Sequence, residues 1–102
     1  MKIVTFKEVE ESLIDSSKHT VEHFQSGCSG DAQVAIIDIN TIFDFEENKH
    51  DACAENFISV AIIDDDSDYE AFKNFGIDAW IKGTDLQDLN SLLNLIEKRH
   101  FS

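Results

Sequence analysis

Two apolar runs, each carrying acids at its end, constrain the fold of this chain more than any other feature. The first runs from Ala32 to Ile39, contains Asp38 near its end and breaks at Asn40. The second runs from Phe57 to Ile63 and leads directly into three aspartates. Short, near-continuous runs of Val, Ile and Ala are typical of strands buried on both faces of a parallel sheet. In open α/β sheets, binding sites lie at the carboxyl ends of such strands, so the acids mark a candidate site.

Length and charge limit the classes of protein to consider. With 102 residues, 42% of them hydrophobic, the sequence predicts one domain over residues 1–102 with a single core. The formal net charge is -13, from 21 acidic and 8 basic residues. Such a surface repels nucleic acid and anionic membranes, so we expect neither as a partner. Basic protein surfaces and cations are the expected partners.

The sequence also indicates where such a chain works. No apolar run approaches the roughly 20 residues that a membrane-spanning helix needs. We see no apolar segment typical of a secretory signal, and two cysteines are too few for a disulfide scaffold. These features favour a cytoplasmic location.

Strands and helices are predicted to alternate along the chain. A strand is expected at 2–6, a helix at 7–26, strands at 32–39 and 57–63, a helix at 69–74, a strand at 79–82 and a last helix at 85–100. Between residues 41 and 56 we expect a loop followed by a short helix at about 50–55. In the last helix the buried stripe comprises Leu86, Leu89, Leu92, Leu93 and Ile96. The order predicts an α/β fold, a three-layer αβα sandwich around a parallel sheet of about four strands.

The second half of the chain resembles the receiver domain of bacterial response regulators. The resemblance is strongest from Ile58 onward, and its most specific piece is Phe-Gly-Ile-Asp-Ala-Trp-Ile-Lys at 75–82. It implies a flavodoxin-like fold. It also implies that Asp38 stands at the phosphoacceptor position, Lys82 at the position of the lysine that contacts the phosphoryl group, and Trp80 at the switch aromatic.

The chain departs from the receiver pattern at four places. The acid pair that holds magnesium in the family reads Phe6-Lys7-Glu8, which leaves only Glu8. Ile63-Asp64 replaces the strand-ending hydroxyl residue, and Gly83 replaces the proline after the lysine. One βα unit is also expected to be missing before the strand that carries Asp38. The resemblance therefore points to a degenerate, shortened receiver.

Asp38 has two competing interpretations. An aspartate that attacks a phosphoryl donor needs a divalent cation held by two or more oxygen ligands. A relocated magnesium site built from Asp38, Asp64 and Glu8, with Lys82 opposite, is one hypothesis. In the other, Asp38 caps a strand end and pairs with Lys82. The missing motif residues favour the second interpretation, with no enzyme activity and no cofactor.

A second candidate site is the sequence His19-Thr20-Val21-Glu22-His23, which fits the inverted zinc-protease pattern. On a helix, His19 and His23 at i and i+4 lie close enough to share a metal. A small metal-binding protein using these two histidines is therefore an alternative. The predicted helix places both on its solvent side, which favours a plain surface helix.

The sequence as a whole predicts a receiver-like regulatory domain that binds proteins and is not phosphorylated. A protein partner is expected, with a homodimer as one form of it, and the resemblance makes Trp80, Leu86 and Leu89 the interface candidates. A functional phosphoacceptor using Asp38 is the other alternative to this hypothesis.

Overall fold

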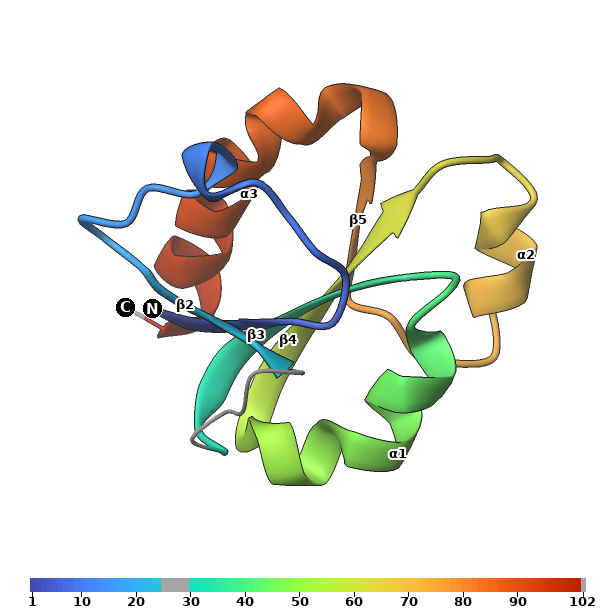
Figure 1. The fold of residues 1–102 in the computed structure, drawn as a ribbon, viewed down its shortest axis with the longest axis horizontal. Helices are drawn as coiled ribbons and strands as arrows, with labels where there is room; N and C mark the ends of the chain where they lie inside the picture. Colours follow the sequence, from blue (N-terminus) through green and yellow to red (C-terminus); the bar gives the residue numbers. More distant parts are fainter. Residues whose placement is uncertain (25–29, 102) are drawn as a thin grey trace.

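The computed structural model describes residues 1–24 and 30–101, and its centre is a five-stranded sheet (Figure 1). All neighbouring strands are parallel, and their order is β2-β1-β3-β4-β5. This is the strand order of flavodoxin-like α/β folds. The strands are β1 (Lys2–Thr5), β2 (Thr20–His23), β3 (Ala32–Asp38), β4 (Cys53–Ile63) and β5 (Ala79–Lys82).

Helices cover both faces of this sheet. They are the α-helices α1 (Ile42–Ala52), α2 (Asp68–Phe72) and α3 (Leu89–Ile96), the 3₁₀ turns η1 (Glu11–Leu13) and η3 (Gly83–Asp88), and the π-helical turn η4 (Glu97–Phe101). In Figure 1, α1 and α2 lie on one side of the strands, and α3 and η1 lie on the other. The predicted αβα sandwich with a parallel sheet is confirmed.

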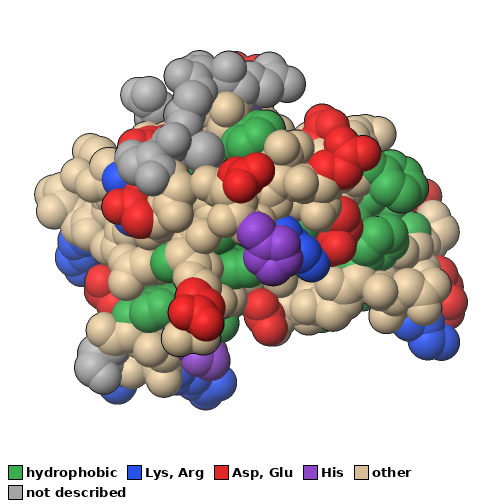
Figure 2. Space-filling model, turned by 90° about the horizontal axis from the view of Figure 1, so that it is seen from below, with side chains coloured by type: hydrophobic (Ala, Val, Ile, Leu, Met, Phe, Trp, Pro, Cys, Tyr) green, Lys and Arg blue, Asp and Glu red, His purple; other side chains and the backbone are tan. Residues whose placement is uncertain are grey.

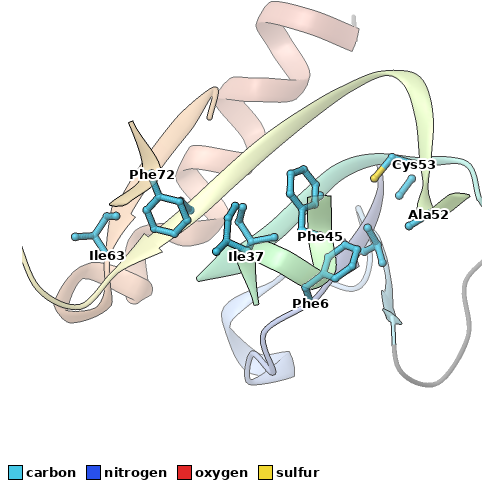
Figure 3. Close-up of a cluster of buried hydrophobic side chains, with 12 residues drawn as sticks. Phe6, Ile37, Phe45, Ala52, Cys53, Ile63 and Phe72 are labelled. Carbon is cyan, nitrogen blue, oxygen red and sulfur yellow. The ribbon is translucent and has the colours of Figure 1, made fainter. Parts of the chain in front are cut away.

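Two hydrophobic cores, one on each face, explain why the central strands are apolar at nearly every position. In β3, Ala35 and Ile37 belong to the core beneath α1 and α2, whereas Val34 and Ile36 belong to the core beneath α3. Successive side chains of a strand point to opposite faces, so a strand covered on both sides buries them all. Figure 3 shows part of the first core, where the labelled Ile37 lies between Phe45 and Phe72.

The predicted helix at 7–26 is wrong for the described part of that range, because Thr20–His23 forms strand β2. This strand pairs with β1 at the edge of the sheet and is the fifth strand. The strand of the βα unit expected to be missing before Asp38 is therefore present. Asp15 begins the turn that precedes it, with its Oδ1 accepting from the backbone N–H and hydroxyl of Ser17. Aspartate and serine favour such local bonds over helix, and β-branched Thr20 and Val21 favour strand.

The prediction of a loop followed by a short helix at about 50–55 is also wrong. The helix α1 begins earlier, at Ile42, and β4 begins at Cys53. Ile42, Phe45 and Ala52 are buried, and the polar interval after Phe45 forms the outward side of the helix. An ion pair between Lys49 and Glu46, three residues apart, lies on that side.

The C-terminal third follows the prediction closely. The fourth predicted strand has the bounds observed for β5, and α2 covers most of the predicted helix at 69–74. The predicted last helix is divided into η3, α3 and η4. Its stripe packs as expected, with Leu89, Leu93 and Ile96 buried and with Leu86 and Leu92 packed beside them. No helix in the described ranges has the length and apolar character needed to cross a membrane.

Candidate functional site

The candidate site lies at the carboxyl edge of the sheet, where three strands deliver polar side chains. β3 ends at Asp38, β4 is followed by Asp64, and β5 ends at Lys82. These strands are adjacent and parallel, so their ends meet at one edge. What this edge can do depends on how each side chain is held.

Asp38 is held by four donors, and its side chain is only 3% exposed. The Nζ of Lys7 donates to Oδ2 at 3.0 Å. Oδ1 accepts from the backbone N–H of Asn40 at 3.1 Å, from the N–H of Thr41 at 3.0 Å and from the hydroxyl of Thr41 at 2.9 Å. The same hydroxyl accepts from the backbone N–H of Asp38 at 2.9 Å. Aspartate bonding to the backbone two and three residues later makes a tight turn, and this turn starts α1.

Lys7, and not Lys82, is the cation that pairs with Asp38, so the pairing expected from the sequence is wrong. Lys7 follows β1, and β1 lies directly beside β3 in the sheet. The parallel register brings Thr5 opposite Ile36, so Lys7 falls opposite the end of β3. β5, which ends in Lys82, is separated from β3 by β4.

The acids after β4 are held mainly by their own loop. Oδ2 of Asp68 accepts from the backbone N–H groups of Asp64 and Asp65, both at 3.2 Å. The N–H of Ser67 donates to Asp65, and this bond holds the pKa of the Asp65 carboxyl below its usual value. A small surface hollow of about 200 Å³ is lined by Ile63, Asp64, Asp65, Asp66, Lys82 and Thr84.

The hypothetical magnesium ligands do not form a three-ligand group. Asp38 is buried and paired with Lys7, whereas Glu8 and Asp64 are exposed. Among residues 1–24 and 30–101, no three or more His, Cys, Asp or Glu side chains are placed to hold one metal ion.

His19 and His23 lie in an extended segment and not on a helix. Four residues of extended chain span about 13 Å, so the two rings cannot share a metal in this conformation. His19 is 3% exposed, and its Nδ1 lies 3.2 Å from the Met1 amino group. Its Nε2 lies 3.3 Å from Oδ1 of Asn94. His19 therefore has a structural role between β1 and α3.

A groove runs along the outer edge of β5, between α2 and α3, with a volume of about 420 Å³. Tyr69, Trp80 and Leu95 line it and are 39%, 37% and 43% exposed. The rings of Tyr69 and Trp80 lie 5.4 Å apart, and Trp80 also meets Phe72 edge-on at 5.6 Å. Large apolar side chains exposed together in a hollow are typical of a binding surface.

Of the three interface residues predicted from the sequence, Trp80 is the exposed one. Leu89 is fully buried and Leu86 is half-buried against the core beneath α3, so neither forms an open surface. Figure 2 shows another property of the surface, with acidic side chains spread over one face of the molecule and hydrophobic side chains exposed between them.

Sequence reasoning missed four residues of these two sites, Lys7, Thr41, Tyr69 and Leu95. A threonine three residues after a strand-ending aspartate is a recognisable turn signal, so Thr41 could have been found. Lys7 could be found only from the strand order, because 31 residues separate it from Asp38. Comparisons of the chain with family models, with curated proteins and with solved structures find no match.

Proposed function

We propose that this chain is a receiver-like regulatory module that acts by binding a protein partner, and that Asp38 serves as a structural carboxylate and not as a phosphoacceptor. The observation that supports this most strongly is that both oxygens of the buried Asp38 carboxylate already have protein partners. Oδ1 has three donors, and Oδ2 bonds to the Lys7 ammonium. An attacking oxygen needs open space in front of it for the phosphoryl donor, and a side chain that is 3% exposed lacks that space.

The charge at Asp38 supports the same proposal. Phosphoryl transfer to a carboxylate needs a cation that contacts both the carboxylate and the transferring group. Here the Lys7 ammonium neutralises Asp38 at 3.0 Å. A lysine ammonium supplies a single positive charge, whereas a divalent cation supplies two and coordinates several oxygens at once.

The groove beside β5 is the proposed binding surface. It gathers three of the exposed large hydrophobic side chains of the described chain, Tyr69, Trp80 and Leu95. Aromatic side chains at the centre of a hollow are the residue types that dominate protein interfaces. The net charge of -13 on each copy opposes a homodimer and favours a different, basic partner. A cytoplasmic setting is part of this proposal.

The test is a retention experiment with cross-linking. The chain is immobilised, incubated with a cytoplasmic extract of its source, and cross-linked through a photoreactive group at Ser91, which lines the groove. The proposal expects a retained protein whose cross-links involve this position and whose retention falls in a Trp80→Ala variant. A Phe43→Ala variant is the matched control, because Phe43 is 71% exposed but lies outside the groove. Retention that depends on Phe43 and not on Trp80 would contradict the proposed surface.

A further inference from the structure

We propose that the groove accepts an extended, cationic segment of the partner, which adds to the sheet as a sixth strand beside β5. This inference rests on the proposed function and specifies both the chemistry of the partner segment and the way it binds. Three observations support the inference: the open outer edge of β5, the side chains on each side of that edge, and the charges around them.

The outer edge of β5 is available for pairing. β5 is the last strand of the sheet, and among the described strands its only partner is β4. In a parallel pair, alternate residues direct their N–H and C=O groups away from the partner strand. These groups form a template for a further strand, and the four residues Ala79–Lys82 include no proline. The edge therefore offers main-chain hydrogen bonds along the floor of the groove.

The two walls of the groove lie where the side chains of an added strand, which point alternately to opposite faces, would meet them. On one side of β5, the ring of Trp80 packs on Tyr69 and Phe72 of α2. On the other side, Leu92 and Leu95 of α3 line the groove. Successive side chains of an added strand would point alternately to the aromatic wall and to the leucine wall. A segment with an apolar residue at every second position fits the leucine wall.

The charges favour a cationic segment. Asp85 and Asp88 line the groove and are exposed, and Lys82 is the one basic residue among the lining residues. The surrounding molecule carries a formal charge of -13. Arginine suits the other alternate positions, because its guanidinium can stack on Trp80 and Tyr69 and pair with nearby carboxylates. A second copy of this acidic chain lacks that complementarity.

The experiment uses a nine-residue peptide of alternating arginine and valine as the probe. Binding is followed by the fluorescence of Trp80, the single tryptophan of the chain, and by the amide NMR signals of residues 79–82. One control peptide replaces arginine with glutamate. A second keeps the arginines but carries N-methyl groups on alternate amides, which removes strand pairing and preserves charge.

We expect saturable binding of the arginine peptide, with shifts in the β5 amides, and no binding of the glutamate peptide. N-methylation should weaken binding by about tenfold or more, because several main-chain hydrogen bonds are lost. A variant with Asp85→Asn and Asp88→Asn should bind several-fold more weakly, and increasingly so at low salt. A matched control with Asp44→Asn and Glu47→Gln loses the same charge on α1, outside the groove, and should bind as the parent does.

Three results would overturn the inference. The first is equal binding of the N-methylated and unmodified arginine peptides, which would exclude strand addition. The second is failure of the arginine peptide to bind, or tighter binding of the glutamate peptide. The third is a dimer in sedimentation that Trp80→Ala dissociates, which would assign the groove to a second copy. None of these results shows whether the groove binds a protein partner at all. The retention and cross-linking experiment tests that proposed function separately.

Discussion

The ammonium of Lys7 lies 3.0 Å from Oδ2 of Asp38, and this ion pair joins the end of β1 to the end of β3. The two partners differ in burial, because the Asp38 side chain is 3% exposed and that of Lys7 is 31% exposed. Losing the cation costs more free energy for a nearly buried carboxylate than for an exposed one, because the buried charge is left without a partner. The pair therefore holds the carboxyl ends of β1 and β3 together, which is the structural role proposed for Asp38.

Replacing Lys7 should destabilise the protein. Lys7→Met keeps most of the side-chain volume and removes the charge, leaving a buried carboxylate without its cation. We expect a loss of about 2 kcal/mol in the free energy of unfolding, less than for a fully buried pair because Lys7 is partly in water. Urea unfolding followed by circular dichroism measures it.

A double variant separates this ion pair from other effects of the substitution. Combining Lys7→Met with Asp38→Asn removes both charges, so part of the lost stability should return relative to Lys7→Met alone. Additive losses from the two substitutions would show that Lys7 and Asp38 do not interact in solution.

Removing the hydroxyl of Thr41 should destabilise the protein about as much as removing the charge of Lys7. It donates to Oδ1 of Asp38 and accepts from the Asp38 backbone N–H, both at 2.9 Å. Thr41→Val keeps the shape and removes both bonds, and we expect a loss of about 1–2 kcal/mol in unfolding free energy. The matched control is Thr84→Val at an exposed position of η3, which should cost less. Equal effects of the two substitutions would mean that the Asp38–Thr41 turn does not stabilise α1.

Two glycines with left-handed backbone conformations allow a paired test of how backbone strain and close packing affect stability. Gly30 and Gly76 both have positive φ, at 77° and 62°, which costs a non-glycine residue about 1–2 kcal/mol. A Cβ at Gly30 would also stand 2.7 Å from the backbone oxygen of Asp51, whereas a Cβ at Gly76 meets no atom within 4 Å. Gly30→Ala should therefore destabilise by about 2–4 kcal/mol, and Gly76→Ala by about half as much. Thermal unfolding of both variants checks the order, and the reverse order would contradict the packing at the end of α1.

Acid should weaken the turn before β2. The pKa of the Asp15 carboxyl is lowered from its usual 3.8, first by the Ser17 hydroxyl and then by the Ser17 backbone N–H. A lowered folded-state pKa contributes stability that is present above the unfolded pKa and is lost as the pH falls through the folded value. The stability difference between the parent and Asp15→Asn should therefore shrink between pH 5 and pH 3. Urea midpoints at the two pH values measure it, and a constant difference would contradict this assignment.

Particular residues show how far the sequence could predict this fold. The strands that carry Ile36 and Ile62 were predictable because burial on both faces leaves a continuous apolar pattern. The last helix was predictable from its leucine stripe. β2 was not, because it is an edge strand whose Thr20 and Val21 are exposed, and its flanking apolar residues fall at helical spacing by coincidence.

The site was less predictable than the fold. Asp38 was identified correctly as a residue at the end of a strand, because its place follows from the local pattern. Its partner was not, since contact with Lys7 depends on which strands are neighbours, and that is settled by long-range packing. The groove depends in the same way on Tyr69, Trp80 and Leu95 meeting from α2, β5 and α3.

The most direct test of the central claim is the intact mass of the protein after incubation with Mg²⁺ and acetyl phosphate, a small phosphoryl donor. The parent chain and an Asp38→Asn variant are compared under identical conditions, with a Lys7→Ala variant as a further comparison. We predict that the parent gains no phosphoryl group, because the Asp38 carboxylate is held by Lys7, Asn40 and Thr41. A gain of one phosphoryl group in the parent that is absent from Asp38→Asn would contradict the assignment of Asp38 as a structural residue.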